Sequence, residues 1–333
     1  MEIVQTISEL QHVPKWGVQT IGNFDGVHIG HQEILAAAGR AAEKNNAELI
    51  VMVFEPHPVA VLHPEMAPGV LTPLDLKKHL LAARGVDRLI VLKTSHELLS
   101  LSPEDFAGRF LIDNIKPRMV VEGNDFNFGA GRAGNIVTLQ KLGAEKGFEV
   151  TVIEPKKIKL STGQTVRISS TMIRYMLEGG HVADAAVALG RPYRLAGKII
   201  SGRGVGRKLG FPTLNMEKPK QVIPSEGVYA GFVQVGEVLD DARTSEVKIP
   251  AVYSIGQART YGSDFPLLIE AHLLVENVGD FIGRYMVMDF VQRIRNQHKF
   301  KSPEDLSKQI TKDCGTAVNI LTKKRAEYRI RIE

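Results

Sequence analysis

The chain of 333 residues contains one cysteine, Cys314, and therefore cannot form an internal disulfide framework. This absence excludes the small disulfide-stabilised secreted proteins and suits a reducing compartment. No apolar run approaches the ~20 residues that a membrane-spanning helix needs. The N-terminal segment MEIVQTISEL carries Glu2 and Glu9 and lacks the basic and apolar regions of a secretory signal. We therefore expect a cytoplasmic protein without a membrane partner.

Aromatic residues are also few, at 6% of the chain, and they are not interleaved with basic residues as in surfaces that bind nucleic acid. The net charge of +5 is uneven, because residues 1–190 hold 19 Lys/Arg and 21 Asp/Glu while residues 191–333 hold 23 and 16. The basic residues of the second half are scattered, which favours a small anionic ligand such as a nucleotide. A protein that binds DNA or RNA in a salt-dependent manner is the alternative. No feature predicts an oligomeric state.

The composition is that of a globular protein, with 44% hydrophobic and 24% charged residues, and the length suits about two domains. The first half alternates between strand-like and helix-like patterns. Strands are expected at 18–24, 47–54, 88–92, 118–122 and 149–153, and helices at 32–45, 73–84, 103–114 and 135–146. This order predicts a mostly parallel sheet covered by helices, with ligands at the carboxyl ends of its strands.

The pattern changes near Gly190 to short β-rich runs that Gly and Pro clusters separate. Strands are expected at 193–201, 228–236, 247–254, 267–275 and 285–295. They predict a small antiparallel barrel or sandwich. A helix is expected from Pro303 to about Arg325, with Ser302 as its N-cap. We therefore expect two domains, residues 1–188 and 189–333.

The first expected strand runs into GNFDGVHIGH, which holds His28 and His31 three residues apart. A glycine-rich turn before a helix points backbone N–H groups and a helix N-terminus at one spot, which favours phosphate. Imidazoles at that spot can stabilise charge that develops on phosphorus. A zinc ligand pair or two surface histidines are the alternatives. The three glycines in the same loop favour the phosphate interpretation.

Two further loops follow strands of the same expected sheet. FEPHP holds His57 between two prolines, which keep the segment extended. GNDFNFG places Asp125 where it could hold a metal through water or accept a hydrogen bond from a ligand. An ordinary structural turn is the alternative in both loops.

The segment RISSTMIR resembles a helix start. Ser169, Ser170 and Thr171 supply hydroxyl groups there, and Arg174 lies one turn further along. Hydroxyls, free N–H groups and a guanidinium together make an anion clamp. Ordinary N-capping is the alternative.

The second half holds another glycine-rich loop, SGRGVGRKLGFPTLN, whose backbone could approach phosphates and whose basic side chains add positive charge. The residues concerned are Gly202, Gly204, Gly206, Arg207 and Gly210. The loop lacks the P-loop pattern, and no strand–helix unit surrounds it. Thr213 and Asn215 share a face if the segment is extended, and their oxygens suit magnesium. A glycine-rich hairpin with a polar edge is the alternative.

Glu270 lies in an apolar run, LLIEAHLL, that is expected to form a strand. A carboxylate in such a strand can act as a general base with a raised pKa, or simply face outward. By the period of two, Leu268, Glu270 and His272 share one face. His272 is therefore a candidate hydrogen-bond partner of Glu270.

Four segments of the first half, G-x-F-D-G-V-H-x-G-H, F-x-P-H-P, G-x-D-F-x-F-G and I-S-S-T-x-I-R, occur in that order. Residues 1–188 thereby resemble the FMN adenylyltransferase module of bacterial bifunctional FAD synthetases, which implies a Rossmann-like nucleotidyltransferase domain. The resemblance implies that FMN attacks the α-phosphate of Mg-ATP, giving FAD and pyrophosphate without a protein nucleophile. By the same resemblance His28 and His31 are catalytic, and His57 and Asp125 line the FMN or metal side. The residues implied at the ATP phosphates are Gly22, Asn23, Phe24, Gly30, Ser169, Ser170, Thr171 and Arg174.

Residues 189–333 resemble the riboflavin kinase module of the same family through G-x-G-R-x-L-G-F-P-T-x-N, P-S-E-G-V-Y, S-I-G and I-E-x-H. The resemblance implies a six-stranded antiparallel barrel with a C-terminal helix. It also implies that the glycine-rich loop binds ATP, that Thr213 and Asn215 bind Mg²⁺, and that Glu270 deprotonates the ribityl hydroxyl of riboflavin. Three features depart from the family pattern: Leu214 in place of alanine, and the segments 257–261 and 273–286.

These resemblances identify a bifunctional flavin-cofactor enzyme that uses Mg²⁺ and ATP, phosphorylates riboflavin to FMN and adenylylates FMN to FAD. The altered loops after Gly256 motivate one alternative, an adenylyltransferase whose second half is a flavin-binding regulatory module. A nucleotidyltransferase that acts on pantetheine phosphate or nicotinamide mononucleotide is another. The kinase-like half argues against that acceptor.

Overall fold

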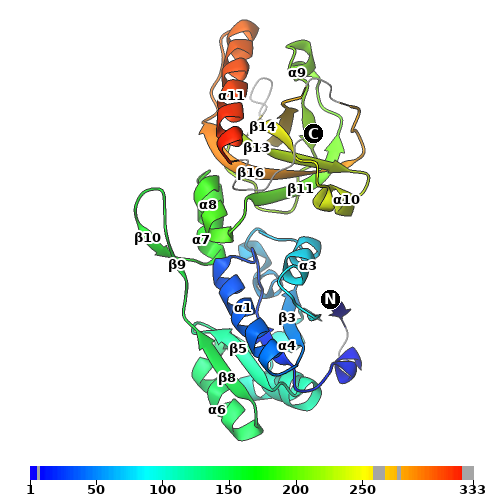
Figure 1. Ribbon diagram of the computed structural model, residues 1–333, viewed down its shortest axis with the longest axis vertical. Coiled ribbons are helices and arrows are strands. Elements are labelled where there is room, and N and C mark those ends of the chain that lie inside the picture. Colours follow the sequence, from blue (N-terminus) through cyan, green and yellow to red (C-terminus); the bar gives the residue numbers. More distant parts are fainter. Residues whose placement is uncertain (6–7, 258–266, 276–278, 325–333) are drawn as a thin grey trace. The chain divides into compact units, whose positions relative to one another are not determined.

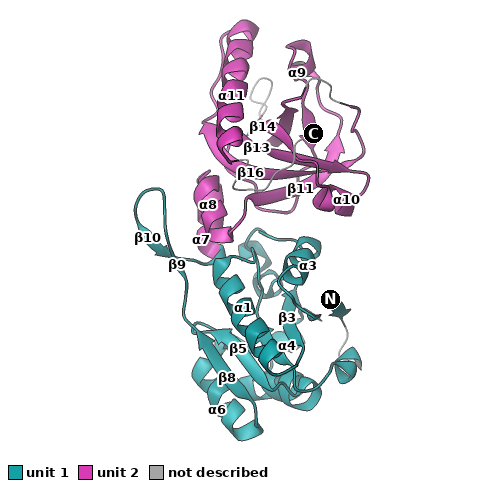
Figure 2. Cartoon of the chain, in the orientation of Figure 1, with its two compact units in different colours: residues 1–170 teal, residues 171–333 magenta. Residues whose placement is uncertain are grey.

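The computed structural model describes residues 1–5, 8–257, 267–275 and 279–324. The chain divides into two compact units, residues 1–170 and residues 171–333, and each is described by itself (Figure 2). No helix among the described residues is long and apolar enough to cross a membrane.

Unit 1 is built on a six-stranded sheet in which every neighbouring pair is parallel (Figure 1). In spatial order the strands are β1 (Glu2–Val4), β4 (Arg88–Lys93), β3 (Leu49–Glu55), β2 (Val18–Ile21), β5 (Met119–Gly123) and β8 (Glu149–Ile153). The predicted parallel sheet is confirmed. The short edge strand β1 was not predicted, because three residues carry too little pattern to identify a strand.

Helices and short turns join these strands. The helices are η1 (Ser8–His12), α1 (Ile29–Lys44), α2 (Pro58–Leu62), η2 (Pro64–Met66), α3 (Leu74–Ala82), α4 (His96–Leu99), α5 (Pro103–Phe106), the π-helical η3 (Ala107–Ile115), η4 (Ala130–Arg132) and α6 (Ile136–Lys146). Two small antiparallel pairs complete the unit, β6 (Asn127–Phe128) with β7 (Gly134–Asn135) and β9 (Lys157–Lys159) with β10 (Thr165–Arg167). Helix α1 begins three residues earlier than predicted, because His28 caps it.

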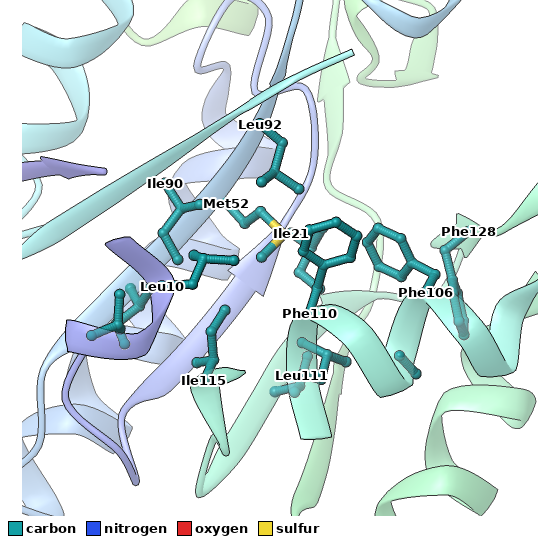
Figure 3. Packing of buried hydrophobic residues seen from close by; sticks show 14 of the residues in the cluster. Leu10, Ile21, Met52, Ile90, Leu92, Phe106, Phe110, Leu111, Ile115 and Phe128 are labelled. Atoms are coloured by element: carbon teal, nitrogen blue, oxygen red, sulfur yellow. The ribbon is translucent and has the colours of Figure 1, made fainter. Parts of the chain in front are cut away.

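The sheet of unit 1 is apolar on both faces, which is typical of parallel sheets covered by helices. Along β3, Ile50 and Met52 belong to one buried cluster, whereas Val51 belongs to the other. Figure 3 shows the first cluster, in which Phe106 and Phe110 of the α5–η3 segment lie beside side chains of the sheet. The two clusters hold the strands as a rigid base for the loops at their carboxyl ends.

Unit 2 contains a closed barrel of six strands, in which each neighbouring pair is antiparallel (Figure 1). In spatial order they are β11 (Tyr193–Ile200), β12 (Leu214–Met216), β15 (Leu267–Leu273), β14 (Ile249–Gln257), β13 (Gly227–Gly236) and β16 (Tyr285–Arg295). The predicted barrel is confirmed, and β12 is the strand that the pattern of short apolar runs did not reveal. Of the segments that depart from the family pattern, residues 258–261 and 276–278 lie outside the described residues.

The helices of unit 2 are α7 (Ser170–Glu178), α8 (Val182–Leu189), α9 (Val205–Lys208), α10 (Leu239–Thr244) and α11 (Pro303–Lys324). Helix α11 begins as predicted, with the Ser302 hydroxyl accepting a hydrogen bond from the N–H of Asp305 at 3.1 Å. Arg295 of the barrel holds α11 through the buried carboxylate of Asp313, with N–O distances of 2.7 and 3.0 Å. Helix α8 ends at Gly190, whose φ of 68° suits glycine.

The link between α7 and α8 is bonded to the barrel within unit 2. The N–H of Ser225 donates to the carbonyl oxygen of Leu177 at 3.0 Å, and the Arg293 guanidinium donates to the carbonyl oxygen of Gly179 at 3.4 Å. Gly180, with a φ of 76°, lies so close to Ser225 and Arg293 that a Cβ atom would come within 2.6 Å of the Ser225 hydroxyl. The segment after Ser170 therefore packs as part of unit 2.

Cys314 of α11 provides a test of this packing. Burial, together with the negative charge of Asp313, raises the pKa of the Cys314 thiol to about 11. The thiolate is the reactive form, so we expect iodoacetamide to label native protein at about pH 8 at least ~100-fold more slowly than unfolded protein. The rate should rise as the pH approaches 11, and mass spectrometry of the labelled chain measures it. Equal labelling of native and unfolded protein would contradict this environment.

Candidate active sites of the two units

The loop between β2 and α1 makes a sharp turn that is anchored to the start of α3. Phe24 and Gly26 have positive φ angles of 47° and 88°. The carboxylate of Asp25 accepts hydrogen bonds from the backbone N–H groups of Leu71 at 3.1 Å and Thr72 at 2.8 Å. The Thr72 hydroxyl in turn accepts from the N–H of Gly26 at 3.0 Å. These bonds hold an unfavourable backbone conformation in place, as in many binding loops.

His28 and His31 lie together at the N-terminus of α1, with their rings stacked and the ring centroids 3.6 Å apart. His28 is the N-cap, and its Nδ1 accepts a hydrogen bond from the N–H of His31 at 3.2 Å. Because Nδ1 accepts, neutral His28 carries its proton on Nε2. Gly30 lies against this ring, since a Cβ atom there would come within 3.2 Å of it.

The electrostatic surroundings of His31 keep its imidazole neutral. Burial lowers the pKa of His31 well below its ordinary value, and the charge of Lys77, with that of His28 whenever His28 is protonated, lowers it further. Its Nδ1 atom is buried and has no hydrogen-bond partner among the described residues. Such an atom is costly to bury and is satisfied when a ligand bonds to it.

The loop after β3 reaches the loop after β2. The Asn23 amide lies 3.0 Å from Nε2 of His57, and Nδ1 of His57 accepts the N–H of Val59 at 3.2 Å at the start of α2. The nitrogen of the Asn23 amide faces this ring atom, and the amide oxygen is buried without a hydrogen-bond partner among the described residues. That oxygen is an acceptor for a ligand that enters the loop.

At the carboxyl end of β5, the structure reveals a buried acid that the sequence analysis missed. Glu122 is 3% exposed, and its carboxyl oxygen accepts from the N–H of Ile21 and the hydroxyl of Thr20 on β2. Burial raises the pKa of Glu122 well above its ordinary value. Asp125, by contrast, is exposed and pairs with Arg167 at 2.5 Å. The sequence places Glu122 in an apolar segment that is expected to form a strand, and a carboxylate in such a segment is the signal of a buried acid.

The predicted clamp RISSTMIR starts beside the histidine loop. The Ser170 hydroxyl donates to the carbonyl oxygen of Asp25 at 2.8 Å, within unit 1. Helix α7 begins at Ser170, as predicted. Thr171 and Arg174 lie in its first turns, and the division of the chain assigns them to unit 2.

A second missed residue of unit 1 is Lys77 of α3, which is 4% exposed. It lies three residues after Leu74 and four residues before Leu81, on the apolar face of its helix. A lysine at an apolar position of a helix is the signal that identifies it. The charge of Lys77 acts on His31, as its effect on the His31 pKa shows.

In unit 2, the glycine-rich loop packs tightly against the strand that follows it. A Cβ atom on Gly202 would meet the Asn215 amide at 2.1 Å, and one on Gly206 would meet the carbonyl oxygen of Phe211 at 2.4 Å. Both positions therefore require glycine. The loop contains the short helix α9, with Arg207 and Lys208 in its last turn.

Glu270 lies at the centre of a polar group inside this unit. It is paired in register with Asn215 of β12 and with Ser254 of β14, so the three side chains share one face of the barrel wall. The Thr213 hydroxyl donates to Glu270, and Arg203 supplies positive charge nearby. Burial raises the pKa of Glu270 and outweighs both of these effects.

His272 does not play the part that the sequence suggested. Its Nδ1 lies 2.8 Å from the carbonyl oxygen of Pro212, and its ring contacts Phe211 edge to face. It therefore anchors the FPTLN segment. A missed neighbour of Glu270 is Gln297, whose amide donates to the Ser254 hydroxyl at 2.9 Å.

Comparison with known proteins assigns both units. The family model for FAD synthetase matches residues 10–172, and the model for riboflavin kinase matches residues 189–321. The chain is 36% identical over 318 residues to the bifunctional riboflavin kinase/FMN adenylyltransferase of Escherichia coli strain K12, covering 95% of this chain and 97% of the relative. The enzyme of that name from Pseudomonas fluorescens is 34% identical over 317 residues, again covering 95% and 97%.

A crystal structure described as a macrolide-efflux protein from Streptococcus pneumoniae is also similar, with a TM-score of 0.82 and 26% identity over 96% of this chain and 99% of that one. The kinase match over the second half favours a catalytic module there over a purely regulatory one. The same matches favour a flavin-cofactor enzyme over a protein that binds DNA or RNA. They also favour FMN as the acceptor over pantetheine phosphate or nicotinamide mononucleotide. The chain belongs to the bifunctional riboflavin kinase/FMN adenylyltransferase family, and it phosphorylates riboflavin to FMN and adenylylates FMN to FAD.

Proposed function

We propose that adenylyl transfer takes place at the carboxyl edge of the unit 1 sheet, with His28 and His31 as its catalytic residues. The observation that carries this proposal is the stacked pair of imidazoles at the N-terminus of a 16-residue helix. An oxygen of the FMN phosphate forms a bond to the α-phosphorus of ATP, the bond to the bridging oxygen breaks, and pyrophosphate leaves with the electron pair. The imidazoles donate hydrogen bonds to the phosphate oxygens while charge shifts between them.

The phosphates of ATP are proposed to bind at the N-terminus of α1 and along the segment that begins at Ser169, whose Ser170 bonds to Asp25. Backbone N–H groups and hydroxyls at helix starts bind anions, and a guanidinium adds charge. The residues proposed for this role are Gly22, Asn23, Phe24, Gly30, Ser169, Ser170, Thr171 and Arg174. The hydrogen bond from Ser170 to the carbonyl oxygen of Asp25 supports this grouping.

On the flavin side we place His57 and Asp125. His57 is joined to Asn23 and so lies beside the proposed phosphate site. Asp125 stands at the end of the neighbouring strand β5, where its exposed carboxylate pairs with Arg167. An exposed carboxylate can exchange that partner for a metal or a ligand.

We propose Glu270 as the general base of the kinase reaction. It accepts the proton of the riboflavin hydroxyl as that oxygen bonds to the γ-phosphorus of ATP, the bond from the γ-phosphorus to the bridging oxygen breaks, and ADP leaves with the electron pair. Burial raises the pKa of Glu270, which makes its carboxylate a stronger base. The strand pairs on both sides of Glu270 fix the position of its side chain.

Thr213 and Asn215 are proposed to hold Mg²⁺. The hydroxyl of Thr213 bonds to Glu270, and Asn215 is its register partner, so three oxygen-bearing side chains gather in one place. Mg²⁺ prefers oxygen ligands, and several of its ligands are usually water molecules and phosphate oxygens. Few protein ligands are therefore needed. When bound, the ion neutralises phosphate charge. The ATP phosphates are proposed to lie on the loop that contains Gly202, Gly204, Gly206, Arg207 and Gly210.

Replacing His31 by alanine should reduce FAD formation from supplied FMN by ~10²–10³-fold, the usual cost of losing a group that stabilises developing charge. FMN formation from riboflavin should be unchanged in the same chain. Chromatographic separation of riboflavin, FMN and FAD measures both rates. The exposed His63 provides the matched control, His63→Ala, which should behave as wild type. Wild-type adenylylation by His31→Ala would overturn the assignment.

Replacing Glu270 by glutamine keeps the shape of the side chain and removes the base. We expect the rate of FMN formation to fall by ~10²–10⁴-fold, the usual contribution of general-base catalysis. Adenylylation of supplied FMN should persist. Glu237→Gln, at an exposed carboxylate of the same unit, is the control. Equal loss of both activities in Glu270→Gln would argue for a folding defect instead of a lost base.

We further propose that residues 1–188 carry the adenylyltransferase and residues 189–333 the kinase. The two family models leave residues 173–188 between them, whereas the compact units divide after Ser170. A fragment of residues 1–188 retains Thr171 and Arg174 and should make FAD from FMN. A fragment of residues 1–170 lacks both and should be inactive, although circular dichroism should show it folded. Activity in the shorter fragment would remove α7 from the site.

A further inference from the structure

Lys77 of α3 is a buried cation that forms no hydrogen bond or close ion pair with another described residue, although two carboxylates act on its charge. The residue is 4% exposed, and its nitrogen is not among the fully buried polar atoms that lack a partner, so the tip of the side chain stays within reach of solvent or a ligand. Its neighbour Lys78 behaves as surface lysines do, with 25% of its side chain exposed and Asp75 at 3.5 Å. Burying an unpaired ammonium costs folding free energy, so proteins rarely do so without a functional reason.

A hydrogen bond places the start of α3 at the carboxyl edge of the unit 1 sheet, because the Thr72 hydroxyl accepts from the N–H of Gly26 in the loop after β2, and Lys77 lies in the first turn of this helix. The carboxylates of Asp25, in the loop after β2, and Glu55, at the end of β3, act on the charge of Lys77. Burial lowers the pKa of Lys77, and these two carboxylates oppose the shift. Asp25 is already bonded to the backbone N–H groups of Leu71 and Thr72, so it does not need Lys77 to satisfy it.

His31 follows the same loop that bonds to the start of α3, and the charge of Lys77 acts on it. Its imidazole is neutral, so it can donate a hydrogen bond but brings no full charge to the reaction. Adenylyl transfer joins two anions, the phosphate of FMN and the α-phosphate of ATP, whose mutual repulsion a fixed positive charge relieves. Bound phosphate also favours the ammonium form of a buried lysine.

We propose that the ammonium of Lys77 is a fixed positive charge of the adenylyl-transfer site, in addition to Arg174, and binds phosphate oxygens of the reacting groups beside His31. The proposal rests on the placement of adenylyl transfer at the 22–31 loop. Lys77 takes part in no proton transfer. The new bond joins an FMN phosphate oxygen to the α-phosphorus, pyrophosphate leaves, and the ammonium faces the charge that moves between them. Lys77 is then a catalytic residue. The hydrogen bonds between Asp25 and the segment before α3 hold the helix that carries Lys77 against the 22–31 loop.

Lys77→Met tests this proposal in the full-length protein, because it removes the charge and keeps most of the apolar volume. We expect kcat/KM for FAD formation from FMN and Mg-ATP to fall ~10²–10³-fold. The thermal midpoint of the free protein should stay equal or rise, because the cost of burying the ammonium disappears. FMN formation from riboflavin, catalysed by the other unit of the same chain, should be unchanged. Lys78→Met is the matched control and should match wild type in all three measurements.

Each other outcome counts against the proposal. A Lys77→Met protein that unfolds, or whose thermal midpoint drops, shows a structural lysine. A stable variant that loses less than about tenfold in adenylylation shows that the charge is not used. Lys77→Arg keeps the charge and should exceed the methionine variant at least tenfold, whereas equal loss in both overturns a charge role. His31→Ala separates the failure of this proposal from the failure of the proposed site. If both His31→Ala and Lys77→Met keep adenylylation, the whole site is misplaced. If Lys77→Met keeps adenylylation and His31→Ala loses it, only the role of Lys77 is wrong.

Discussion

The adenylyltransferase unit depends on the separation of two parallel strands. β2 and β5 pair only at Val18 with Met119 and at Gln19 with Val120, whereas their outer neighbours continue the sheet. Where the ladder ends, the buried carboxyl group of Glu122 accepts the N–H of Ile21 that β5 no longer pairs. Strands that diverge in this way open a crevice at the carboxyl edge of a sheet, which is where ligands bind in such folds. The histidine loop leaves β2 at this point.

The loops that are proposed to bind phosphates are held in place differently in the two units. In unit 1 a carboxylate, Asp25, anchors a strained loop by bonding to backbone N–H groups just before α3, and this loop leads into the N-terminus of α1, the proposed phosphate site. In unit 2 the loop approaches β12 so closely that Gly202 and Asn215 allow no side chain between them. The first arrangement tolerates side chains in the loop, and the second demands glycine.

The chemistry of each reaction agrees with the acids and bases that each unit buries. Adenylyl transfer needs no base, because a phosphate oxygen attacks, and unit 1 offers a neutral His31 and a buried Lys77. Phosphorylation of a hydroxyl needs a base, and unit 2 offers Glu270, whose pKa burial raises. The need for a base in one unit and not in the other follows from the attacking group of each substrate and not from the fold.

The sequence alone determined the parallel sheet, the barrel, the cap at Ser302 and the loops that are proposed to carry the chemistry, because these follow from local periodicity and turn residues. Only the tertiary structure decided which polar side chains are buried and what they face. Lys77 and Glu270 both stand in apolar patterns, yet the charge of Lys77 acts on His31, whereas Glu270 bonds to Thr213 and pairs in register with Asn215. His272 shares the strand face of Glu270 but bonds to Pro212. Such partners come from strands and loops distant in sequence, and local pattern carries no information about them.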